Sequence, residues 1–268
     1  MRLYNSKYLF FVFLSLAFLT YTCSDSSTGP DSGTDPDPDP DPSVEFNSKA
    51  APGDSANSFL EGDQYSSLEL EIDYMPGFAP TQGGLDRLRT FLEQRLNKNS
   101  ITFLDPTEIP SGNQDAYSAN DIRNLEESNR DNFTEAGSNT LHAYFLIVDG
   151  EFEQSNVLGV AYWNTSMAFF GKTIEDISGN PPIAPSKEQV EGTVFRHEIG
   201  HNLGLVGIGS PHPQDQEPHE TEGSAHCTVD GCLMEPAVET ANFFQNLSGE
   251  TPDLDPLCIE DLQANGGS

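Results

Sequence analysis

Two histidines one helical turn apart are the first residues in the sequence that could do chemistry. His197 and His201 bracket Glu198 in the segment His-Glu-Ile-Gly-His. Residues i and i+4 lie on one face of a helix, so two imidazoles at this spacing can bind one Zn²⁺ at about 2.0–2.1 Å. Glu198 flanks such a metal and can accept a proton from a water molecule that the metal activates. The spacing therefore predicts metal-assisted hydrolysis with Glu198 as the general base.

A catalytic zinc also needs a third protein ligand, and the histidines cluster in a way that could supply it. Five of the six histidines lie between residues 197 and 226. Each of His212, His219 and His226 is a candidate for the third ligand. Carboxylates surround the first two of these, which would also suit a weak Ca²⁺ site, although no EF-hand spacing is present.

The sequence around the motif is that of an amphipathic helix. Ser186 and Gln189 have the spacing of a capping box, which predicts that a helix begins there. Val190 and Val194 then continue into His197 and His201 along one stripe, so the helix face changes from apolar to metal-binding along its length. We therefore expect this helix to present both imidazoles to a cleft.

The other elements follow from hydrophobic periodicity. Apolar and acidic residues alternate strictly from Leu68 to Tyr74, which predicts a half-buried strand, and leucines recur at helical spacing between residues 83 and 97. Further strands are expected at 101–104, 141–148, 157–163 and 166–170, and a further helix at 118–129. The order β-α-β-α-β-β-α, with a loop-rich tail, predicts an α+β fold of α/β-like order with a mixed sheet.

Composition and the N-terminus indicate an exported protein that does not bind nucleic acid. The formal net charge of -31 repels phosphate backbones. Residues 1–22 have a basic start and a short apolar run, as in a signal peptide. Cys23 follows and resembles the lipidation site of bacterial lipoproteins, which predicts a membrane anchor at the outer membrane or cell surface. Residues 23–47 read as a disordered acidic Asp-Pro tether, and residues 48–268 as the folded domain.

The motif resembles that of the metzincin metallopeptidases, HExxHxxGxxH followed by a methionine turn. Gly204 is in register, but Gly207 stands where the third histidine should be. The segment His226-Cys227-x4-Cys232-x-Met234 resembles the end of the archaemetzincin motif, and the chain is similar to lipoprotein "membrane metalloproteases" of Bacteroidetes-type bacteria. The resemblance implies a metzincin-like zincin fold with a twisted mixed sheet, His226 as the third zinc ligand, and Met234 as the turn methionine.

Three cysteines follow the motif: Cys227, Cys232 and Cys258. Archaemetzincins hold a second, structural zinc on four cysteines, but Asp261 stands in the fourth place here. An exported chain lies in an oxidising compartment, so we expect a disulfide among the three cysteines rather than a second zinc. The sequence leaves the pairing open.

The function that these residues predict is a zinc-dependent endopeptidase acting on a peptide or protein substrate. Trp163 lies near the end of an apparent edge strand, which in metzincins aligns the substrate by backbone pairing. His142 lies within an apolar strand and is expected to be a core or rim residue. The alternative is a non-catalytic binding lipoprotein that retains a zincin fold, although the intact Glu198 argues against it.

Overall fold

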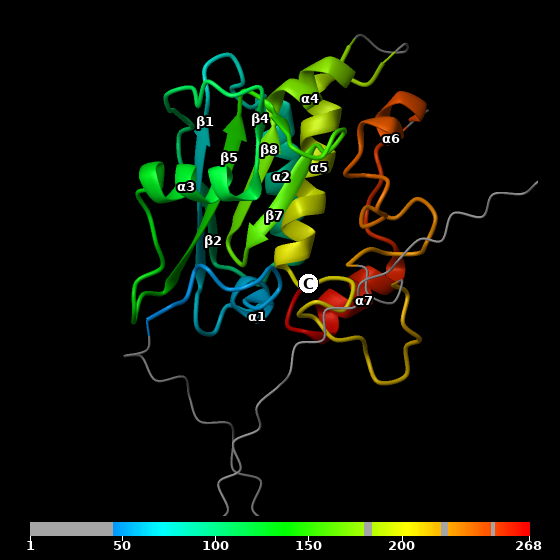
Figure 1. The fold of residues 1–268 in the computed structure, drawn as a ribbon. Coiled ribbons are helices and arrows are strands. Elements are labelled where there is room, and N and C mark those ends of the chain that lie inside the picture. The colour runs from blue at the N-terminus through cyan, green and yellow to red at the C-terminus, as the bar shows by residue number, and fades with distance from the viewer. Residues whose placement is uncertain (1–44, 180–183, 221–224, 248–249) are drawn as a thin grey trace, which may run out of the picture. The chain divides into compact units, whose positions relative to one another are not determined.

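The computed structural model describes residues 45–179, 184–220, 225–247 and 250–268 (Figure 1). The predictions of a signal peptide, of lipidation at Cys23 and of nearly all of the tether concern residues 1–44, which lie outside this part. Within the described residues, no helix has both the length and the apolar character needed to cross a bilayer.

A six-stranded mixed sheet forms the centre of the domain. Its strands run in the order β2-β1-β5-β8-β7, and β3 pairs with the end of β1. The pairs β1–β2, β1–β5 and β5–β8 are parallel, whereas β7 is antiparallel to β8 and forms one edge of the sheet. The two remaining strands, β4 and β6, pair separately. The strands are β1 (Ser67–Tyr74), β2 (Ser100–Phe103), β3 (Thr107–Glu108), β4 (Ala116–Tyr117), β5 (Thr140–Val148), β6 (Glu151–Phe152), β7 (Gly159–Trp163) and β8 (Ser166–Phe170).

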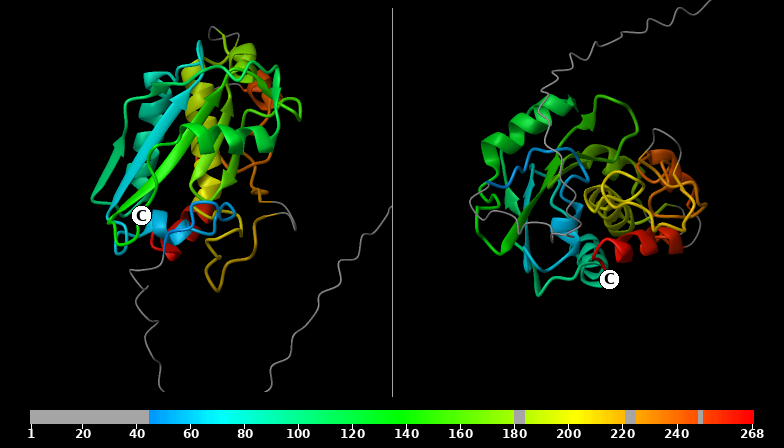
Figure 2. Two further views of the ribbon diagram at one scale, coloured as in Figure 1. Left: turned by 60° about the vertical axis from the view of Figure 1, so that its left-hand side comes forward. Right: turned by 90° about the horizontal axis from the view of Figure 1, so that it is seen from below.

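Helices cover both faces of the sheet (Figures 1 and 2). Leu70 and Phe145 belong to the larger core, on the face covered by α2 and α5. Tyr144 and Leu146 point to the opposite face and pack with Ile122 of α3. The helices are α1 (Ala56–Leu60), α2 (Gln82–Arg95), α3 (Ala119–Asn129), α4 (Gly171–Ile177), α5 (Lys187–Asn202), α6 (Ala241–Asn246) and α7 (Pro256–Ala264). The predicted mixed sheet and α/β-like order are confirmed.

The acidic side of β1 differs from the half-buried strand that its alternation predicted. Glu71 and Asp73 are buried, at 7% and 3% exposure. Backbone N–H groups of Asp131 and Asn132 donate to the Glu71 carboxylate at 2.8 and 2.7 Å, and the Tyr144 hydroxyl donates to Asp73 at 2.8 Å. The acids are therefore covered by the segment after α3 and by β5, and their burial is compensated by hydrogen bonds.

The helix that carries the histidine motif begins as its sequence predicted. The Ser186 side chain accepts a hydrogen bond from the Gln189 N–H, and the Gln189 side chain accepts one from the Ser186 N–H, which completes the capping box. Thr81, at the start of α2, donates its N–H to Glu191 at 2.8 Å and so joins the two helices on this face. The predicted loop-rich tail is wrong in one respect, because it contains α6 and α7. Asp255 caps α7 and Pro256 occupies its first turn, which is a helix-start signal.

Candidate metal centre

The last two turns of α5 bring His197 and His201 together. Both are buried, at 0% and 7% exposure, and their Nε2 atoms lie 3.2 Å apart. Donors around a tetrahedral zinc at about 2.0–2.1 Å are roughly 3.3–3.4 Å from one another. Burial lowers the pKa of His197 to about 4 and that of His201 well below its ordinary value, so both rings are neutral at pH 7. Neutral imidazole is the form that binds a metal.

His226 completes the trio, although it lies far beyond the register of the short motif. Its ring centroid is 5.5 Å from that of His197 and 5.1 Å from that of His201. The chain leaves α5 through Gly204 and Gly207, whose positive φ angles place both in the left-handed region. Glycine adopts this conformation without strain, so the helix ends there and the backbone turns away. The structure brings together the three histidines that the archaemetzincin resemblance implied, whereas His212 and His219 lie in a separate cluster.

Glu239 is a member of this site that the sequence did not reveal. Its Oε2 lies 3.5 Å from Nε2 of His226 and 3.9 Å from Nε2 of His197. One donor atom from each of the three histidines and one from Glu239 all fall within 4.8 Å of one another. The Leu158 N–H donates to the Glu239 carbonyl at 3.0 Å, which fixes this segment beside the start of β7. The donor set is therefore three imidazoles and one carboxylate, a combination that zinc accepts.

Glu198 lies beside this donor set and is held by the edge strand. The Ala161 N–H of β7 donates to its Oε2 at 2.8 Å, while its Oε1 is buried without a hydrogen-bond partner among the described residues. Burial raises the pKa of Glu198 well above its ordinary value, and the charge of Glu239 raises it further. A cation held by the histidines would oppose both effects, because a nearby positive charge favours the ionised carboxylate.

Leu233 and Met234 contact the part of α5 that carries the two motif histidines. The Leu233 carbonyl accepts a hydrogen bond from His197 Nδ1 at 2.7 Å, which directs the lone pair of Nε2 toward the other histidines. Met234 is fully buried, and its Sδ would lie only 2.5 Å from a Cβ placed at Gly200. Met234 therefore packs directly against the helix between the two motif histidines.

A pocket of about 360 Å³ opens onto these groups. It is lined by Glu198, His201, His226 and Glu239 together with Val160 and Ala161 of β7. β7 was expected to be an edge strand, and its pairing with β8 alone among the described strands confirms this. Its free edge thus borders the pocket.

Two other predicted residues lie outside this pocket. Trp163 ends β7, with the Lys49 ammonium 5.0 Å from its ring. His142 lies in β5, where Nδ1 is 3.3 Å from Glu69 Oε1, and it takes no part in the site.

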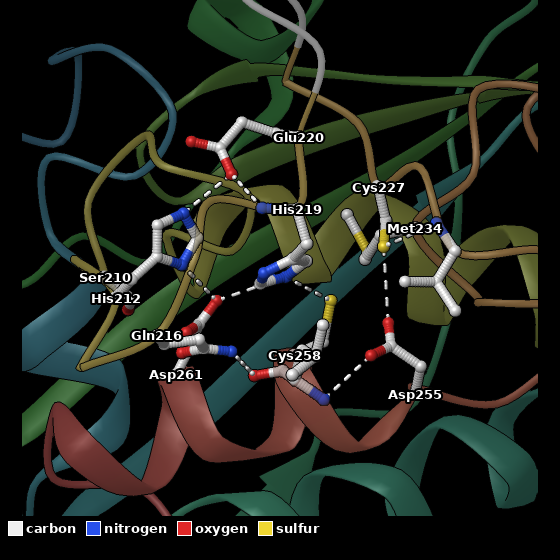
Figure 3. Close-up of polar contacts among 12 residues, drawn as sticks. Ser210, His212, Gln216, His219, Glu220, Cys227, Met234, Asp255, Cys258 and Asp261 are labelled. Atoms are coloured by element: carbon white, nitrogen blue, oxygen red, sulfur yellow. Dashed lines mark hydrogen bonds and ion pairs between the residues drawn. The ribbon is translucent and has the colours of Figure 1, made fainter. Parts of the chain in front are cut away.

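The predicted disulfide is not formed. Cys227, Cys232 and Cys258 are buried and free, and the Cys232 and Cys258 sulfurs are 3.8 Å apart. A disulfide would bring two sulfurs to about 2.05 Å. Asp255 lies with the cysteines, and its Oδ2 is 3.3 Å from the Cys227 sulfur (Figure 3). One donor atom from each of the three cysteines and from Asp255 all fall within 4.8 Å of one another.

This cysteine group has the dimensions of a zinc site. Sulfurs around a tetrahedral zinc with bonds of about 2.3 Å are roughly 3.8 Å apart, so the three thiols and Asp255 fit a zinc ion. Asp255 is the carboxylate that lies with the three thiols, whereas Asp261, in the place of the fourth cysteine of archaemetzincins, lies beside His212 and His219.

No protein-family model matches the chain, and no curated protein matches it in sequence. Among solved structures, the chain is similar to archaemetzincin from Methanopyrus kandleri. That alignment covers 76% of this chain and 96% of the other, with a TM-score of 0.48 and 16% sequence identity. At these values the match supports no inference about chemistry.

Proposed function

We propose that this protein is a zinc-dependent endopeptidase whose active site is the pocket beside β7. The observation that carries the proposal is the meeting of His197, His201 and His226 around one point, with the Glu198 carboxylate facing the same pocket. A site that only bound a metal would not need a buried carboxylate next to the ligands. The alternative of a non-catalytic binding protein lacks any observation that favours it.

The proposed roles follow from where each group lies. His197, His201 and His226 would hold the zinc ion and leave its fourth position open to water, with Glu239 beside the histidines. When bound, zinc lowers the pKa of a water molecule to about 7 and polarises a peptide carbonyl. Glu198 would accept the proton of the attacking water and deliver it to the leaving amine. The N–H of Ala161 holds one oxygen of Glu198 and leaves the other for this transfer.

The edge of β7 suggests how a peptide substrate would be aligned. Val160 and Ala161 line the pocket, and an extended peptide could add to the sheet beside them through backbone hydrogen bonds. Such pairing would position the scissile bond relative to Glu198 without reading particular side chains.

We further propose that the three cysteines and Asp255 hold a second, structural zinc. Three buried thiols close enough to share a metal are at risk of oxidation in an exported protein, and a metal ion would prevent it. Cys227 directly follows the ligand His226, and Cys232 precedes Leu233 and Met234 closely, so this ion would fix the segment that supports the active site. Export and the lipid anchor at Cys23 stay predictions from the sequence.

The Glu198→Gln variant tests the proposed mechanism. A glutamine can still accept the Ala161 N–H, so the fold and the bound zinc should be retained, while loss of a general base lowers the rate by about 10²–10⁴-fold. Cleavage of casein or a peptide library is compared with that of Glu188→Gln, an exposed position in the first turn of the same helix. Undiminished cleavage by Glu198→Gln would reject the mechanism, and a zinc-loaded parent protein that cleaves nothing would favour the binding alternative.

A further inference from the structure

A second group of histidines and carboxylates lies outside the proposed active site and adjoins the cysteine group. His212, His219 and Glu220 belong to the irregular segment between α5 and His226, and Asp261 belongs to α7 (Figure 3). Asp261 has 0% exposure and His219 has 5%, so the group is largely removed from water. Burying two imidazoles and two carboxylates is costly unless hydrogen bonds or a metal ion compensate for it.

Asp261 holds one ring nitrogen of each histidine. Its Oδ2 lies 2.9 Å from His212 Nδ1 and 3.4 Å from His219 Nε2. A carboxylate behind an imidazole, accepting its N–H, fixes the tautomer and is the usual companion of a histidine that binds a metal through its other nitrogen. Asp261 occupies this position for His212, and the same oxygen lies near the His219 ring.

The opposite side of the group brings together further donor atoms, of which His219 Nδ1 has no partner among the described residues. His212 Nε2 lies 2.6 Å from Glu220 Oε2, and one ring nitrogen of each histidine falls within 4.8 Å of the other and of a Glu220 oxygen. His219 Nδ1 is buried and makes no hydrogen bond with the described residues. A buried nitrogen left in this way destabilises the folded chain, and a cation bound to it would remove that penalty.

We propose that His212, His219 and Glu220 form a third metal site in this chain. It would bind a divalent transition metal, zinc in particular, with Asp261 orienting the His212 ring. Two imidazoles and a carboxylate, with water in a fourth position, form a donor set that zinc accepts. The site is distinct from the cysteine group, although the two adjoin, because His219 Nε2 is 3.4 Å from the Cys258 sulfur.

A metal at this site would fix the position of the segment that leads to His226. The segment between Leu203 and His226 contains the 19 residues that are additional to the short motif. Its described residues form neither a helix nor a named strand. A metal bound at His212, His219 and Glu220, with Asp261 behind it, fastens the middle of this segment to α7. The site would therefore help to return His226 to the other two histidines of the active site.

Zinc content per chain distinguishes this site from a hydrogen-bonded cluster. The full-length protein and its variants are equilibrated with zinc and separated from free metal, and zinc is counted by mass spectrometry. Glu220→Gln and His212→Gln are expected to retain one equivalent fewer than the parent. Glu217→Gln, an exposed acid of the same segment, should retain the parent content. Glu220 is at the partly exposed edge of the group, so its amide variant should preserve the fold, which circular dichroism checks.

Parent-level zinc in both Glu220→Gln and His212→Gln would overturn the proposal. The group would then be an ion pair of His212 with Glu220 and Asp261. Parent-level zinc would also be found if His219 were a ligand of the cysteine-bound ion, and that outcome would overturn the third site as well. The count is independent of peptidase activity, so a failure of this proposal leaves the proposed function standing, and the reverse also holds.

Discussion

Gly159, on β7, controls the position of the proposed general base without taking part in the chemistry. A Cβ at this residue would lie 2.8 Å from Glu198 Cγ, 2.9 Å from Glu198 Oε1 and 2.9 Å from Val194 Cγ1. Carbon atoms in contact are ordinarily about 3.5–4.0 Å apart. In Gly159→Ala, Glu198 must therefore withdraw by on the order of 1 Å from the new methyl group, given that contact distance. Glu198 is 1% exposed and is tied to Ala161, so it has little room in which to do so.

The expected losses of activity and stability follow from displacements of the same size in other proteins. A misplacement of about 1 Å in a catalytic group costs up to about 10²-fold in rate, and overpacking a core costs about 1–3 kcal/mol of stability. We therefore expect kcat/KM of Gly159→Ala to fall by about 10- to 100-fold. The zinc content should remain that of the parent, because no histidine contacts the new methyl group among the nearest atoms.

The assay is peptide hydrolysis at matched zinc content, with thermal unfolding of each variant. Gly171→Ala is the control, because its Cβ would lie 2.4 Å from Phe78 Cδ1 but outside the lining of the pocket. This control should lose stability and keep its kcat/KM. Equal activity in Gly159→Ala and the parent, or an equal loss in both variants, would refute the placement of Glu198 described above.

Two further predictions concern the metals. Glu239→Gln should weaken zinc binding at the three histidines by about 10–100-fold, as loss of a partner of the metal site does, and an unchanged affinity in a competition titration with a chelator would place Glu239 outside the site. Cys227, Cys232 and Cys258 should all react with a thiol reagent after denaturation with a chelator under non-reducing conditions. If only one of the three reacted, the other two would be joined in a disulfide, as the sequence predicted.

The parts of the fold that could be predicted from sequence are those whose signals are local. The capping box of Ser186 and the apolar run of β5 each lie within a few residues, and both elements form as expected. The helix start at Asp255 and Pro256 is an equally local signal, but the polar residues before it favour a loop. The acidic side of β1 was misread because alternation shows which residues differ in polarity and not what later packs over them.

The site was predictable where the ligands share one helix and less so where the chain returns from a distance. His197, Glu198 and His201 follow from spacing alone, whereas His226 required a resemblance. Glu239 lies in an irregular segment and has no periodic signal. It reaches the site through long-range contacts beside β7, where Val157 forms a bridge with Thr240. The disulfide was inferred from the compartment, but the separation of the thiols depends on the fold, which places Asp255 among them.

The central claim is that three histidines of this chain hold one zinc ion beside Glu198. Anomalous scattering at the zinc edge, from crystals of the zinc-loaded protein, tests it most directly. We predict a peak at about 2.0–2.1 Å from Nε2 of His197, Nε2 of His201 and a ring nitrogen of His226, with the Glu198 carboxylate facing it across the pocket. A structure without zinc at that point, or with His226 turned away from a zinc held by other groups, would contradict the account.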